Sequence, residues 1–207
     1  MSKIEFKPTG NKVGCFIYTN LQEVKKGQIV EIKKLLDKYG VLFFKNQDLK
    51  PEQYVNFSSN FGTPAKYPML KPHKSFKDIY VIERKKTDTG KSFGEGPHTD
   101  SSYLVNPPRF TFLQAIDVPE EGKGNTLFYN QFLAYEALPK DIKQKIENLK
   151  GVFSSQGKIA QTRKLRMADH GTSGTKEIRS EHNLVQLING RKTIYCSPGH
   201  VVGIVNF

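Results

Sequence analysis

Turn-forming residues divide the middle of the chain into short segments and leave no room there for a long helix. Pro107 and Pro108 end the first segment, and the Gly-Lys-Gly-Asn run of residues 122–125 ends the second. Proline fixes φ and removes a backbone donor, whereas glycine and asparagine accept the angles of tight turns. We therefore predict short strands at residues 110–116 and 126–129, followed by a helix.

His98 and Asp100 stand in the segment before these turns, as a His-x-Asp triplet that we expect on an extended strand. Side chains two residues apart on a strand point to the same face, so the triplet offers an imidazole nitrogen and a carboxylate oxygen to one point. These are two of the three protein ligands of a two-His-one-carboxylate iron(II) site. Alone, the triplet is a weak signal, because a surface strand with a solvated Asp and a titrating His gives the same pattern.

Apolar periodicity predicts both helices and strands along the rest of the chain. Apolar residues at helical spacing predict a helix over residues 22–39, and Pro51 begins a second helix that ends by Gly62. Asn189 and Gly190 predict a hairpin turn, because both accept positive φ angles. Further helices are expected at residues 132–138 and 140–149, and further strands at residues 13–18, 41–44, 79–83, 151–154, 184–188 and 193–196. Pattern alone gives an α+β chain.

Several motifs follow one another in a fixed order. They are His98-Thr99-Asp100, Pro107-Pro108, Gly124-Asn125-Thr126-Leu127-Phe128 and Ala134-Tyr135-Glu136-Ala137-Leu138-Pro139, with residues 39–47, Phe61-Gly62 and residues 182–199 beside them. This order resembles the taurine-dioxygenase-like (TauD/TfdA) family of iron(II)- and 2-oxoglutarate-dependent oxygenases. The resemblance implies a double-stranded β-helix (jelly-roll) core with flanking helices. It also implies a single domain over residues 1–207 that is incomplete at its C-terminus.

The resemblance also implies the roles of particular residues. His98 and Asp100 would bind Fe(II), and the Thr126 hydroxyl would bind the co-substrate 2-oxoglutarate. The implied reaction hydroxylates a small, anionic organic substrate (a sulfonate such as taurine, or a carboxylate) with dioxygen and releases succinate and carbon dioxide. A carboxylate at Asp100 favours hydroxylation over halogenation. Two departures from the family pattern, Pro97 and Asn125, bear on the surroundings of the metal and on substrate choice.

Two functional residues of the family have no counterpart in this chain. The distal histidine ligand and the arginine that pairs with 2-oxoglutarate lie beyond the segment that the chain reaches at Gly199. The other histidines are His73, His170, His182 and His200; His182 matches a family position that is not the distal ligand, and His200 is a candidate substitute. The alternative function is therefore a truncated, catalytically inactive domain that binds metal weakly or mediates interactions.

Two loops are candidates for covering a substrate. Residues 63–77 are rich in Pro and Lys, and Tyr67 or His73 would line the substrate site if this loop closes over it; an ordinary surface loop is the other interpretation. Residues 156–180 are basic, contain Gly and Ser, and are expected to be mobile or to form a lid.

Charge and composition bound the partners. The net charge of +12 would suit a nucleic acid, but the basic residues are mostly dispersed lysines rather than clustered arginines among stacking aromatics. No run reaches the roughly 18 to 20 apolar residues of a membrane span. The first residues also lack the apolar stretch of a secretory signal peptide. We expect a small-molecule substrate, no nucleic-acid or membrane partner, a cytoplasmic location and two buried free thiols, Cys15 and Cys196. A homo-oligomer remains open.

Overall fold

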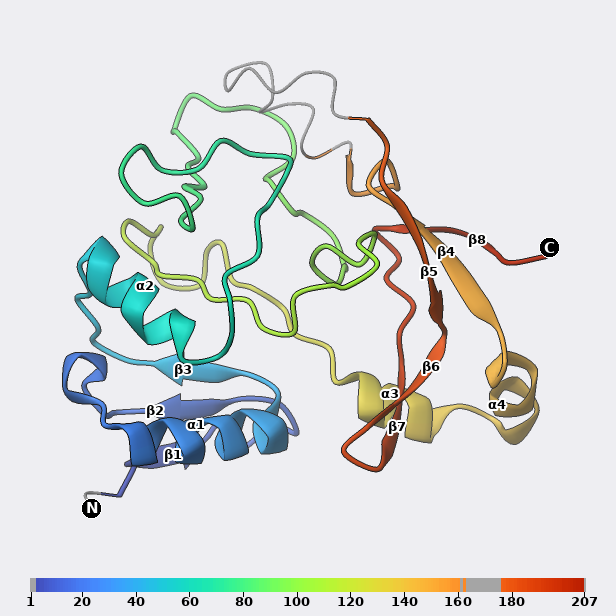
Figure 1. Ribbon diagram of the computed structural model, residues 1–207, viewed down its shortest axis with the longest axis horizontal. Coiled ribbons are helices and arrows are strands. Elements are labelled where there is room, and N and C mark those ends of the chain that lie inside the picture. Colours follow the sequence, from blue (N-terminus) through green and yellow to red (C-terminus); the bar gives the residue numbers. More distant parts are fainter. Residues whose placement is uncertain (1–2, 161, 163–175, 207) are drawn as a thin grey trace. The chain divides into compact units, whose positions relative to one another are not determined.

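The computed structural model describes residues 3–160, 162 and 176–206. The chain folds into two compact units, each built from two separate stretches of sequence. Unit 1 consists of Met1–Pro64 and Phe112–Asn130, and unit 2 consists of Ala65–Thr111 and Gln131–Phe207. Each unit is described by itself below (Figure 1).

Helices and short strands are both present, which confirms the predicted α+β class. Unit 1 contains β1 (Phe6–Pro8), β2 (Cys15–Ile17), the 3-10 helix η1 (Leu21–Glu23), α1 (Lys26–Tyr39), β3 (Leu42–Phe44) and α2 (Pro51–Ser59). Unit 2 contains α3 (Gln131–Ala137), α4 (Lys140–Ile146), β4 (Lys150–Ser154), β5 (Arg179–Asn183), β6 (Val185–Ile188), β7 (Arg191–Ile194) and β8 (Val201–Ile204). In the described part of the chain, no helix has the length and hydropathy needed to cross a membrane.

The sheet of unit 1 has the order β1-β2-β3. Strands β1 and β2 are antiparallel, whereas β2 and β3 are parallel and are connected through α1. Parallel neighbours require a crossover connection, and the predicted helix supplies it. Helix α1 ends at Gly40, which has a φ of 74° and donates its N–H to the Leu36 carbonyl. Such a left-handed residue after a helix is most easily a glycine.

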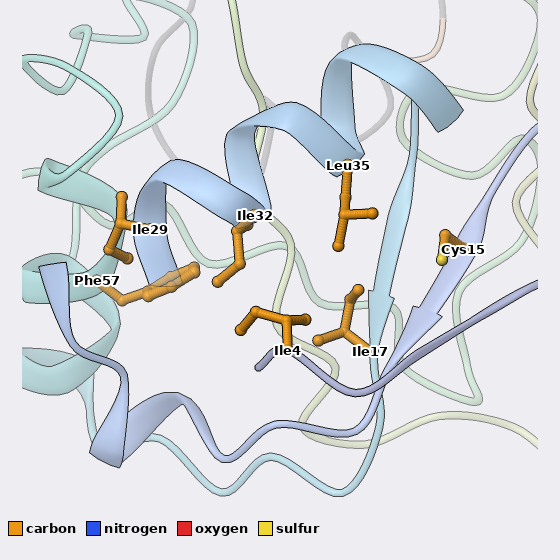
Figure 2. Packing of buried hydrophobic residues seen from close by; sticks show 7 residues of the cluster. All are labelled: Ile4, Cys15, Ile17, Ile29, Ile32, Leu35 and Phe57. Atoms are coloured by element: carbon orange, nitrogen blue, oxygen red, sulfur yellow. The ribbon is translucent and has the colours of Figure 1, made fainter. Parts of the chain in front are cut away.

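One face of α1 forms the core of unit 1. Ile29, Ile32 and Leu35 are buried on this face. Ile32 and Leu35 project toward Ile4 and Ile17, and Ile29 lies beside Phe57 (Figure 2). Their spacing places them on one side of a 3.6-residue helix. The helix predicted over residues 22–39 is therefore confirmed, although it begins at Lys26.

Unit 2 contains a sheet of order β5-β4-β8 and the separate hairpin β6-β7. Strand β4 pairs with antiparallel neighbours on both sides (Figure 1). Its register with β8 shifts between Val152 and Phe153. Asn189 and Gly190 connect β6 to β7 with φ angles of 50° and 78°, which confirms the predicted hairpin turn. Helix α3 packs against β7, where Arg191 lies 4.6 Å from the Phe132 ring and bonds Glu136.

Four expected strands are not formed. Residues 79–83, 110–116 and 126–129 have no ladder partner in the part of the chain that the structure describes, and the same holds for the segment of His98 and Asp100. An extended segment becomes a strand only when a second backbone pairs with it, which sequence alternation does not guarantee. The sheets of the described residues do not close into a jelly roll, so that architecture stays a prediction.

Two further predictions concern cysteines and loops. Both cysteines are free, but Cys196 is exposed and only Cys15 is buried, so the expectation of two buried thiols was wrong for Cys196. Residues 63–77 contain no helix or strand, as expected of a loop. The lid predicted at residues 156–180 falls largely outside the described residues.

Candidate metal centre

His98 and Asp100 lie in unit 2, in an unpaired segment whose backbone turns at Asp100. The expected strand is absent, and Ser101, with a φ of 51°, redirects the chain directly after the pair. The two side chains nevertheless converge, since His98 Nε2 lies 3.1 Å from Asp100 Oδ1. The structure therefore brings together the two residues that the sequence singled out.

The second ring nitrogen of His98 is held by the backbone. Nδ1 lies 2.8 Å from the carbonyl oxygen of Gly96, and because this oxygen can only accept, Nδ1 carries the proton of the bond. Gly96 has a φ of 119°, an angle that residues with a Cβ rarely adopt. The glycine thus places a carbonyl where it orients the His98 ring with Nε2 toward Asp100.

This arrangement leaves two acceptor atoms face to face. A neutral imidazole has one N–H, so the bond to Gly96 leaves Nε2 with a lone pair directed at the Asp100 carboxylate. Two lone pairs 3.1 Å apart are stabilised by a positive charge between them, either the second proton of an imidazolium or a metal cation. The pair therefore offers two donor atoms of the kind that a metal site requires.

The spacing of the two atoms also fits a metal. Ligand atoms at right angles, each about 2.1 Å from a small divalent cation, lie about 3 Å apart, close to the 3.1 Å between Nε2 and Oδ1. The side chains of His98 and Asp100 keep 25% and 49% of their surface accessible, so further ligands can reach the same point. Within the described residues, however, no three His, Cys, Asp or Glu side chains are grouped to hold a metal ion.

Thr111 orients the carboxylate from its other side. The Thr111 hydroxyl donates a hydrogen bond of 2.8 Å to Asp100 Oδ2. The contacts with His98 and Thr111 hold the pKa of Asp100 below its ordinary value, although partial burial acts in the opposite direction. The carboxylate is thus kept ionised, as a metal ligand must be. Sequence reasoning missed Thr111, since an isolated threonine in an apolar segment gives no signal of this role.

The other candidate residues have surroundings of their own. Thr126 belongs to unit 1 and is exposed. His73 accepts backbone N–H groups of its own loop through Nδ1. His182 contacts the Leu104 carbonyl and the Ser180 hydroxyl through Nε2, which suits a structural role. His170 lies outside the described residues.

His200 contacts the pair through the ring of His98. Its ring is 4% exposed and packs edge-on against the His98 ring, with the centroids 6.4 Å apart. Its Nδ1 lies 3.2 Å from the Ser154 carbonyl oxygen, and the Tyr103 ring covers it at 5.0 Å. The buried histidine therefore packs against His98, and no three-ligand group forms among the described residues.

Comparison with known proteins gives a consistent result. Residues 5–207 match the profile described as "Taurine catabolism dioxygenase TauD, TfdA family". The chain is 31% identical over 139 residues to the alpha-ketoglutarate-dependent 2,4-dichlorophenoxyacetate dioxygenase of Cupriavidus pinatubonensis. The aligned region covers 59% of this chain and 48% of the relative. It is 30% identical over 135 residues to an alkylsulfatase of Acinetobacter baylyi, over 65% of this chain and 41% of the relative.

Solved structures share the fold. A taurine dioxygenase from Burkholderia xenovorans superposes with a TM-score of 0.72 at 23% identity, over 99% of this chain and 66% of the other. The chain therefore spans less than half the length of the two relatives above and about two thirds of this solved chain.

Proposed function

Because the chain belongs to the taurine catabolism dioxygenase TauD, TfdA family, we propose that it serves in the 2-oxoglutarate-dependent hydroxylation of a small, anionic organic substrate. The family is one of 2-oxoglutarate-dependent dioxygenases, and a relative carries that dependence in its name. The observation that carries the proposal is the convergence of His98 Nε2 and Asp100 Oδ1 at 3.1 Å within this family match.

In this proposal His98 and Asp100 hold Fe(II), the cation that suits imidazole and carboxylate ligands in such sites. Gly96 and Thr111 orient these two side chains through the hydrogen bonds described above. When bound, the iron couples oxidative decarboxylation of 2-oxoglutarate to the transfer of one oxygen atom from dioxygen into a substrate C–H bond. The chain's own task is to keep the two ligand atoms fixed and one side of the site accessible.

Three further features belong to the proposal. The Thr126 hydroxyl binds 2-oxoglutarate, in keeping with its place in the Gly-Asn-Thr motif. Residues 1–207 form part of a single domain with a jelly-roll core, which the superposition on a taurine dioxygenase supports. The remaining protein ligand and the cation for the far carboxylate of 2-oxoglutarate have no assigned residues in the described part of the chain.

The substrate class follows from charge. The relatives named above are described as acting on 2,4-dichlorophenoxyacetate, a carboxylate, and as an alkylsulfatase. The formal net charge of +12 raises the local concentration of small anions around this chain. A sulfonate, sulfate ester or carboxylate is therefore the class to test first.

The test measures succinate released from 2-oxoglutarate by the chain with ferrous iron and dioxygen. Taurine, 2,4-dichlorophenoxyacetate and an alkyl sulfate serve as substrates. We expect substrate-dependent succinate that Asp100→Asn reduces to background, while Asp117→Asn, a change at an exposed carboxylate of unit 1, leaves it unchanged. Absence of succinate with every substrate would remove the proposal.

A second function is favoured by one observation, the lack of a three-residue metal group among the described residues. A catalytically inactive domain would bind a divalent cation weakly through His98 and Asp100 and release no succinate. Metal binding that depends on both residues, combined with no turnover in the assay above, would identify this alternative.

A further inference from the structure

A turn far along the sequence lies against the metal pair in unit 2. It runs from Ser197 to His200 and is closed by the N–H groups of His200 and Val201, which both donate to the Ser197 carbonyl. Strand β8 follows directly and pairs with β4, so the turn is anchored to a sheet. A rigidly anchored element can impose its geometry on a loop that packs against it.

Ser197 contacts the residue between the two candidate ligands. The Thr99 N–H donates a hydrogen bond of 3.0 Å to Ser197 Oγ, and Ser197 is 2% exposed. The bond fixes the peptide that joins His98 to Thr99, and with it the direction in which His98 and Asp100 leave the backbone. Buried backbone donors are costly to leave without a partner.

Gly199 allows the same turn to approach His98. A Cβ added to Gly199 would lie 2.8 Å from His98 Cβ, 3.1 Å from Ile159 Cβ and 3.3 Å from the Pro97 carbonyl oxygen. The Gly199 carbonyl in turn accepts a hydrogen bond of 2.9 Å from the Ile159 N–H, which holds the turn in place. Any side chain at this position would displace His98.

We propose that the turn Ser197–His200 is the positioning element of the metal pair: Ser197 fixes the Thr99 peptide, and Gly199 and the His200 ring fix the place of His98. The inference rests on the proposed function, because it assigns the turn to the same site. Groups that orient metal ligands typically change metal affinity by 10- to 100-fold when they are removed. We expect a loss of about 10-fold for Ser197→Ala.

The experiment is a titration of the full chain with Mn²⁺, followed by the paramagnetic broadening of histidine ring signals in NMR spectra. This readout needs no turnover and works for weak binding. Ser197→Ala is compared with Ser155→Ala, a matched control in the same unit, since Ser155 Oγ also accepts a backbone N–H, that of Ile178, at 3.0 Å. Both changes remove a partly buried backbone-to-hydroxyl hydrogen bond, but only Ser197 contacts the residue between His98 and Asp100.

A second pair of variants tests the proposal independently in case Ser197→Ala fails to fold. Gly199→Ala is compared with Gly203→Ala, because a Cβ at Gly203 would meet no atom within 4 Å. Support for the proposal is a weaker Mn²⁺ affinity for Ser197→Ala and Gly199→Ala with wild-type affinity for both controls. Equal affinities for Ser197→Ala and Ser155→Ala would overturn the positioning role while leaving the proposed function intact. Mn²⁺ binding that is unaffected by His98→Ala would overturn both.

Discussion

The Thr111 hydroxyl donates a 2.8 Å hydrogen bond to Oδ2 of Asp100, and this bond leaves Oδ1 facing His98. A carboxylate that is free to rotate about χ2 presents either oxygen to a cation. The threonine therefore selects which oxygen meets the imidazole, and it does so from the segment that follows Pro107 and Pro108.

Thr111→Val should weaken Mn²⁺ binding by about 10-fold, because the isosteric side chain keeps its volume and loses the donor. Thr111→Ser keeps the hydroxyl and should stay within about twofold of the wild type. Titration of each variant with Mn²⁺ measures the effect. Equal affinities for the valine and serine variants would show that the hydroxyl does not orient Asp100.

Gly96→Ala should lower the metal affinity through the backbone. At a φ of 119° a Cβ is strained by about 1–3 kcal/mol, and relaxation moves the carbonyl that holds His98 Nδ1. Gly10→Ala is the matched control, since Gly10 also has a positive φ, of 87°, but lies in unit 1. Both variants should lose stability in urea unfolding, and only Gly96→Ala should lose Mn²⁺ affinity.

Ile32→Ala should destabilise unit 1 by about 2–5 kcal/mol, because Ile32 is fully buried and its removal leaves a cavity. Val30→Ala on the same helix should change the free energy of unfolding by less than about 0.5 kcal/mol, since Val30 is 54% exposed. Urea unfolding followed by circular dichroism compares the two. Similar losses for both variants would contradict the packing shown in Figure 2.

Alkaline pH should destabilise unit 1 through Tyr54. Burial raises the pKa of Tyr54 to about 12, and its hydroxyl donates to the Phe112 carbonyl. The folded state thus keeps a proton that the unfolded chain releases near pH 10, so stability present below pH 10 is lost as pH rises toward 12. The slope for one tyrosine is less than about 1.4 kcal/mol per pH unit, because the ring is partly exposed.

The measurement is the urea midpoint of the wild type and of Tyr54→Phe at pH 8, 10 and 11. The variant should lose less stability over this range, although Tyr195 in unit 2, whose pKa burial also raises to about 12, leaves a residual slope. Tyr129→Phe, a change at an exposed ring, is the control and should follow the wild type. Parallel curves for Tyr54→Phe and the wild type would contradict the prediction.

The helix and the hairpin turn could be predicted from the sequence, because both depend on residues close together in the chain. The helical spacing of residues 22–39 and the Asn189-Gly190 turn both led to the observed α1 and hairpin, because periodicity and positive φ are local properties. The strands expected at residues 110–116 and 126–129 failed for the opposite reason, since pairing depends on another segment. Strands β1, β5 and β8 were missed because each is short and is defined by its partner.

Some residues of the candidate site could also be predicted from the sequence, and others could not. The convergence of His98 and Asp100 could be predicted, because a His-x-Asp triplet is visible in the sequence, and their role as metal ligands stays a prediction. Thr111 and Ser197 could not, since each acts through one hydrogen bond to a residue 11 or 98 positions away. A single threonine or serine in a sequence does not predict a hydrogen bond to so distant a residue.

The bond between Thr99 and Ser197 also orders events during synthesis of the protein. The serine is added 98 residues after the threonine, which takes about 5 to 20 seconds at the roughly 5–20 residues per second of a ribosome. Throughout that interval the nascent chain carries His98 and Asp100 without the turn that fixes the peptide between them. In the proposed function, capture of a metal ion by His98 and Asp100 in their folded geometry is therefore a late event, after the sheet of β1, β2 and β3 has had time to form.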